Sequence, residues 1–76
     1  MKEFAALNPT TKADFLQHGF DEAAIDRLIQ SAPDPKRVNV PALIAAVTQF
    51  VVDLKARNFL ALAGDIAAIL AALQGA

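Results

Sequence analysis

Residues 59–74 constrain this fold most, because they have the pattern of a helix with almost no polar residue. Asp65 and Gln74 are the polar side chains in the segment. A helix that is apolar on every side is buried on every side or lies in a membrane. We therefore expect each flank of this helix to be shielded from water. Its bulky face consists of Phe59, Leu62, Ala63, Ile66, Ile69, Leu70 and Leu73.

The opposite face carries Leu60, Gly64, Ala68 and Ala72, spaced four residues apart. Small residues at this spacing let another helix backbone approach closely. Alanine is also the best helix former, which accounts for any single alanine without an interface, whereas a glycine costs ~1 kcal/mol in a helix interior. We predict that these four residues form an interface with the first helices, with another chain, or with both. If Gly64, Ala68 and Ala72 were all hydrated with nothing across them, the case for an assembly role would fail.

Residues 40–54 predict an amphipathic helix, with Asp53 on its polar side. One helix over residues 41–74 would be ~50 Å long, which is long against a compact radius of gyration of ~11 Å for this length. We predict a break at Asn58, a residue that favours caps over helix interiors, with Asn58 as the cap of the last helix. The bulky face of that helix should then pack on the apolar stripe formed by Val40, Leu43, Ile44, Val47, Phe50, Val51 and Leu54.

The first half of the chain predicts two short helices that meet at a corner. Asn8 or Thr10 caps the first, which runs to about His18, and Gly19 ends it in a left-handed conformation. Asp21 caps the second helix, over residues 22–31. Phe20 should pin the corner by touching Phe15 and Ile25. The prolines of residues 32–39 predict a short linker that is not helical.

The corner carries a resemblance to a known family over residues 15–28. The segment Phe15-Leu16-Gln17-His18-Gly19-Phe20-Asp21, followed by Ala24, Ile25 and Leu28, is similar to the first two helices of ubiquitin-associated (UBA) domains, with their Met-Gly-Phe corner. Here His18 stands in place of the methionine, and residues 31–39 form a longer loop than that of the family. We interpret the resemblance as a shared local solution for the corner, and we carry no ubiquitin binding over to this chain.

Composition limits the classes of partner and of stabilising chemistry. A chain of 76 residues without cysteine has no disulfide or thiolate metal site to support a small core. Hydrophobic residues make up 55% of it, above the roughly 45–50% of average proteins. The net charge of −1 provides no field that attracts nucleic acid. The N-terminus has no secretory pattern, so we expect a cytoplasmic location.

Few residues are candidates for chemistry, and each has a simpler interpretation. His18 and Asp14 lie four residues apart, but they lack the further ligands or the nucleophile that a metal site or a catalytic pair requires. Lys36 and Arg37 make a basic pair too small for a nucleic-acid footprint. Asp65 should lie at the rim of its helix or meet a cation, for which Lys36, Lys55 and Arg57 are the candidates. We expect no enzyme activity, no metal and no cofactor.

Together these patterns predict an all-α fold, a small four-helix bundle made of two helical hairpins with the C-terminal helix at its centre. Residues 1–76 form a single domain, with the first helix pair at residues 8–31, a proline-containing linker at 32–39 and a second hairpin at 40–74.

We expect a non-enzymatic module for protein–protein interaction or assembly. It acts as a homo-oligomer, or as a small component or inhibitor of a larger phage or bacterial complex. One alternative is a membrane-associated hairpin, although a helix of ~24 Å is short for a hydrocarbon core of ~30 Å and carries Asp65 near its middle. A second alternative is a UBA-like helical domain that binds a peptide between its helices.

Overall fold

The computed structural model describes residues 2–75. This part of the chain contains five α-helices and one short 3-10 helix, joined by loops. Met1 and Ala76 lie outside it. No strand forms in the described part, so the predicted all-α class is confirmed. The linker prediction is wrong in one detail, because a 3-10 turn, η1, forms within it. The elements are α1 Lys2–Ala5, α2 Pro9–Gln17, α3 Glu22–Gln30, η1 Pro35–Arg37, α4 Val40–Lys55 and α5 Phe59–Leu73.

Three helix starts are fixed by side-chain caps, and two of these caps, Asn8 and Asp21, are predicted from the sequence. In each case a side-chain oxygen accepts a hydrogen bond from a backbone N–H of the first turn, which otherwise has no partner in the helix. The caps are Asn8 with the Thr11 N–H at 2.8 Å, Asp21 with the Ala24 N–H at 2.7 Å, and Asn39 with the Ala42 N–H at 3.2 Å.

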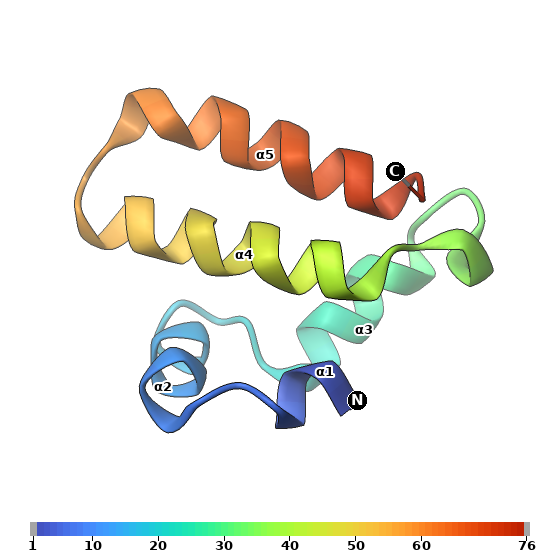
Figure 1. Cartoon of the computed structure of the whole chain (residues 1–76), viewed down its shortest axis with the longest axis horizontal. Coiled ribbons are helices and arrows are strands. Elements are labelled where there is room, and N and C mark those ends of the chain that lie inside the picture. The colour runs from blue at the N-terminus through green and yellow to red at the C-terminus, as the bar shows by residue number, and fades with distance from the viewer. Residues whose placement is uncertain (1, 76) are drawn as a thin grey trace.

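The corner between α2 and α3 forms as predicted. Gly19 has a φ of +82°, and the Phe20 N–H donates to the Phe15 carbonyl oxygen at 2.8 Å, which is the pattern of a glycine helix stop. The Phe15 and Phe20 rings lie 6.3 Å apart, and Phe20 also meets Phe50 of α4 at 6.0 Å. The two short helices make little contact with each other, and α2 lies against α4, so the prediction that they form a packed hairpin is wrong (Figure 1).

The break between α4 and α5 lies where the sequence predicts it, but Arg57 makes it. Arg57 has a φ of 55°, in the left-handed region. The Asn58 N–H donates to the Asp53 carbonyl oxygen at 2.9 Å, so the helix ends in the same pattern as at Gly19. Asn58 makes no side-chain capping bond to α5. The location of the break is confirmed, and Asn58 occupies the N-cap position as predicted, but without a side-chain hydrogen bond to the helix.

We predict that Arg57→Gly stabilises the protein by about 1 kcal/mol. A left-handed residue with a Cβ costs roughly 1–2 kcal/mol, and the greater freedom of glycine in the unfolded chain offsets part of the gain. Urea denaturation measures the change. Arg57→Ala is the control, because it removes the same side chain and keeps the strain. Equal shifts in the two variants would show that the backbone conformation is not the cause.

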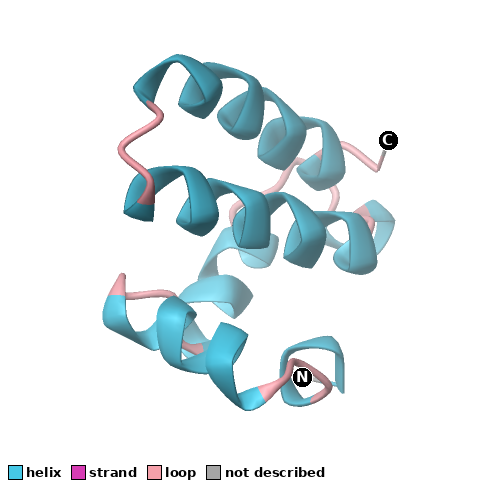
Figure 2. Cartoon of the chain, turned by 60° about the vertical axis from the view of Figure 1, so that its left-hand side comes forward, coloured by secondary structure: helices cyan, strands magenta, loops and turns pink. Residues whose placement is uncertain are grey.

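Helix α4 is the central element of the fold. Figures 1 and 2 show it between α5 on one side and α1, α2 and α3 on the other. Three of its residues, Leu43, Val47 and Val51, are among the most deeply buried large side chains, together with Phe15 and Ile25. The prediction that the C-terminal helix is central is therefore wrong, because α4 is the helix that contacts α1, α2 and α5.

Helix α5 docks on a different side of α4 and through a different face than the sequence predicts. Ala46 and Asp53 are seven residues apart, so they share one side of α4, and both are buried. Asp65, Ala72 and Leu73 are the buried residues of α5. Small side chains let the two helices approach closely. As a consequence the bulky residues Phe59, Ile66 and Leu70, predicted to pack inward, are exposed.

The C-terminal end of α5 is anchored, and its beginning is not. The Asn39 N–H, just before α4, donates to the Ala72 carbonyl oxygen at 3.0 Å. Ala72 and Leu73 belong to the same hydrophobic cluster as Val38 and Ile25. At the other end, Leu60 is 95% exposed. The radius of gyration is 11.8 Å, close to the ~11 Å of a compact chain of this length.

Candidate functional site

Two carboxyl groups face each other in the contact between α4 and α5. Asp53 is 7% exposed and Asp65 is 8% exposed. The Gln49 side-chain amide donates to both oxygens of Asp53, at 3.3 Å each. The Asp65 Oδ2 atom is buried and has no hydrogen-bond partner within the described residues. The predictions that Asp65 lies at the rim or meets a cation, and that Asp53 lies on an exposed side of α4, are both wrong.

This arrangement favours a proton on Asp65. Its pKa is raised above the ordinary value, first by a side-chain hydrogen bond with Asp53, then by burial, and then by the negative charge of Asp53. An ionised carboxylate is costly to bury without partners, and two carboxylates that share one site resist ionising together. The Gln49 amide donates to Asp53 and not to Asp65, so Asp65 is the carboxyl group of the pair that lacks a donor from Gln49.

The candidate residues His18 and Asp14 do not form a catalytic pair. The His18 Nδ1 atom lies 2.9 Å from the backbone oxygen of Asp14. The Asp14 carboxylate instead accepts a hydrogen bond from the Lys55 Nζ atom at 3.0 Å, which links α2 to α4. Nothing in the sequence points to this ion pair, whose partners are 41 residues apart. Because both side chains keep contact with water, the pair contributes little to stability.

The described residues contain no group of three or more His, Cys, Asp or Glu side chains placed to hold a metal ion. Lys36 and Arg37 lie in η1 and are exposed.

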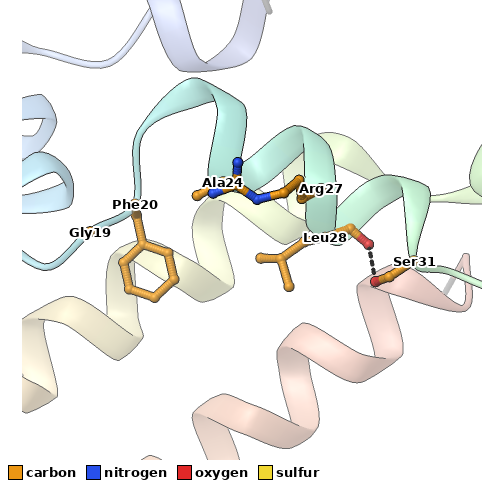
Figure 3. Close-up of a pocket in the computed structure, with 6 residues that line it drawn as sticks. All are labelled: Gly19, Phe20, Ala24, Arg27, Leu28 and Ser31. Atoms are coloured by element: carbon orange, nitrogen blue, oxygen red, sulfur yellow. Dashed lines mark hydrogen bonds between the residues drawn. The ribbon is translucent and has the colours of Figure 1, made fainter.

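A shallow groove of about 390 Å³ runs along α3 (Figure 3). Phe20 and Leu28 contribute apolar side chains to it, and the Arg27 side chain extends along the helix toward Ala24. Ser31 lies at one end, where its hydroxyl donates to the Leu28 carbonyl oxygen at 2.7 Å. The groove therefore offers apolar contact and one cation, and sequence reasoning did not identify it as a site.

Most of the large hydrophobic side chains that are exposed in the described residues lie on α5. We define the α5 outer surface as Phe59, Leu60, Ile66 and Leu70. Phe59, Ile66 and Leu70 follow one stripe at spacings of seven and four, and Leu60 extends the surface around the first turn. The exposed fractions are 67% for Phe59, 95% for Leu60, 48% for Ile66 and 53% for Leu70.

The predicted small-residue interface divides into two parts. Ala72 is 1% exposed and packs in the core of its own chain. Gly64 and Ala68 are exposed, and a Cβ atom on Gly64 would meet nothing within 4 Å. The case for an assembly role fails if Gly64, Ala68 and Ala72 are all hydrated. Gly64 and Ala68 are exposed in this way, whereas Ala72 is not. The large exposed side chains of α5, Leu60 among them, carry what remains of that argument.

Comparisons with known proteins identify no relative of this chain. No protein-family model matches the chain, and no curated protein or solved structure is significantly similar to it. Within the described residues, no helix combines the length and the apolar character needed to cross a membrane.

Proposed function

We propose that this protein is a non-enzymatic assembly module that self-associates through the α5 outer surface. The observation that carries the proposal is the exposure of four large apolar side chains on one helix. Together they leave on the order of 450 Å² of apolar surface in water, taking roughly 150–200 Å² for a large side chain. The largest apolar patch on a typical monomer is roughly 300–600 Å², and patches of this size are often functional.

A second copy of the chain is the occupant that suits this surface best. The described part of α5 has one charged residue, Asp65, and it faces α4. Two copies can therefore bring their α5 helices together without like charges opposing each other. A two-fold pair needs only one self-complementary surface. The exposed area is roughly half of the ~800 Å² per partner in a standard stable interface, so the dimer should dissociate on dilution.

We predict that Leu60→Glu abolishes self-association. The substitution places a charge within the apolar contact, which should raise the dissociation constant roughly tenfold or more. Leu60 is 95% exposed, so the fold of the single chain is not disturbed. Light scattering over a concentration series measures the molar mass. The wild-type mass should rise from the 8.0 kDa of one chain toward twice that value, and the variant should stay at one chain.

Leu16→Glu is the matched control, because Leu16 is a half-exposed leucine on α2. This variant should associate as the wild type does. The proposal is wrong if the wild type keeps the mass of one chain at every concentration, or if both glutamate variants weaken association equally.

The groove along α3 favours peptide binding as a second candidate function. Phe20, Ala24 and Leu28 suit the apolar face of an amphipathic helix, and Arg27 suits an acidic residue on that helix. Amide chemical shifts recorded over the same concentration series separate the two surfaces. Shifts at residues 59–70 support the α5 outer surface, whereas shifts confined to residues 19–31 support the groove. Membrane association and a cytoplasmic location stay predictions from the sequence.

A further inference from the structure

We propose that Asp53 and Asp65 form a proton-binding site that fastens α5 to α4, and that α5 separates from α4 once both carboxyl groups are ionised. The site lies within one chain, so the proposal does not depend on self-association. It rests on the position of the pair in the only extensive contact that α5 makes with another described helix.

The geometry of the pair favours a proton between α4 and α5. Both carboxyl groups are more than nine-tenths buried, and the Gln49 amide supplies hydrogen bonds to Asp53 alone. If Asp65 carries the proton, its hydroxyl donates to the Asp53 carboxylate across the two helices. Loss of that proton converts this bond into a repulsion between two buried negative charges and leaves the Asp65 oxygens without a donor.

Among the described residues, no basic side chain takes the place of the proton between Asp53 and Asp65. Lys55 is the nearest basic residue to Asp53 along α4, and its ammonium group binds Asp14 of α2 at 3.0 Å. Arg57 follows the end of α4 and is exposed. Asp65 is the only titratable residue of α5. The charge of the pair therefore depends on solution pH and not on a neighbouring side chain.

The contact between α4 and α5 is otherwise weak enough for this proton to matter. Its buried residues are largely small, such as Ala46 and Ala72. The large residues of the α5 outer surface contribute little to it, because they are exposed. Ala72, Leu73 and the Asn39–Ala72 backbone bond hold the C-terminal end of α5. Separation should therefore begin at Phe59 and proceed toward the end of the chain.

The expected direction of the pH effect follows from the raised pKa of Asp65. The folded chain holds this proton to a higher pH than the unfolded chain does. The stabilisation is therefore complete below the ordinary aspartate pKa of ~3.9, and it is lost as the pH rises through the folded value.

We predict that Asp65→Asn removes this pH dependence. Asparagine keeps a donor for the Asp53 carboxylate and cannot ionise. Urea denaturation midpoints should be compared between wild type and variant from pH 4 to pH 8. The midpoint of the variant should move above that of the wild type as the pH rises. Asp26→Asn is the control, because Asp26 is exposed on α3, and the difference between it and the wild type should not grow in this way.

Amide hydrogen exchange gives a second readout that stability alone would not move. After correction for intrinsic exchange rates, protection in residues 59–70 should fall with rising pH while protection in α3 stays constant, and Asp65→Asn should keep residues 59–70 protected. The proposal is overturned if wild type and Asp65→Asn respond to pH alike, or if α3 and α5 lose protection together.

It is also overturned if Mg²⁺ or Ca²⁺ at neutral pH restores the wild type to the level of Asp65→Asn, because the pair would then bind a metal cation. Repeating the series in Leu60→Glu separates this result from the outcome of the self-association test.

Discussion

Phe15→Ala is expected to lower the free energy of unfolding by about 3–5 kcal/mol, the range for large truncations in a core. Phe15 is 0% exposed, and its ring meets Phe4 of α1 at 6.2 Å and Phe20 at 6.3 Å. Its loss opens a cavity at the point where α1, α2 and the corner join α4. Urea denaturation followed by circular dichroism measures the change.

The neighbouring residue provides the matched control for this prediction. Leu16 is 53% exposed on the same turn of α2, so Leu16→Ala should cost only about 0.5 kcal/mol. A domain of this length has roughly 4–11 kcal/mol of stability in total, so Phe15→Ala can be unfolded. Phe15→Leu, with an expected loss of about 1–2 kcal/mol, then gives a measurable intermediate. If Phe15→Ala and Leu16→Ala cost the same, the aromatic cluster is not the core of the first half.

The local structure of the first half could be predicted because each signal acts within a few residues. Asn8 and Asp21 accept hydrogen bonds from N–H groups three residues on, and Gly19 takes the left-handed conformation that a helix stop favours. These interactions depend on residue type and spacing, which the sequence displays directly. The resemblance of residues 15–28 to a UBA corner depends on the same local signals, and for that reason it does not extend to the rest of the fold.

The orientation of α5 could not be predicted from hydrophobicity, because the helix is apolar on every side. Burying the bulky face and burying the small face are both compatible with such a pattern. The apolar stripe of α4 shares one core with Phe4, Phe15 and Ile25 of the first three helices, and α5 reaches this core mainly through Ala72 and Leu73 near its end. The rest of α5 lies along the side of α4 that carries Ala46 and Asp53, which are also buried.

One sequence signal could have located the carboxyl pair. Asp53 lies seven residues after Ala46, and Asp65 lies seven residues before Ala72. Seven residues are close to two helical turns, so each aspartate shares a face with a small residue. In an antiparallel hairpin those two small faces can meet, and the aspartates then meet as well. The general rule that a lone charge on an apolar helix lies at its rim led instead to the prediction that Asp65 lies at the rim.

The last prediction compares one leucine from each of the two long helices. Leu43→Ala in α4 should cost about 2–5 kcal/mol, because a fully buried leucine is truncated. Leu60→Ala in α5 should cost less than about 0.5 kcal/mol, because a side chain that is 95% exposed loses no contact within its own chain. The same chemical change at both positions thus measures which helix the rest of the chain packs on.

Protein concentration has to be controlled in this comparison, because association of folded chains raises their apparent stability. In dilute solution Leu60→Ala reports on the single chain, and its cost should stay small. In concentrated solution the wild type gains stability from the proposed dimer, so the cost of Leu60→Ala should grow while that of Leu43→Ala stays constant. A large cost of Leu60→Ala in dilute solution would mean that α5 is buried by its own chain, against the packing described above. A cost that stays small at every concentration would leave α4 at the centre and remove self-association through α5.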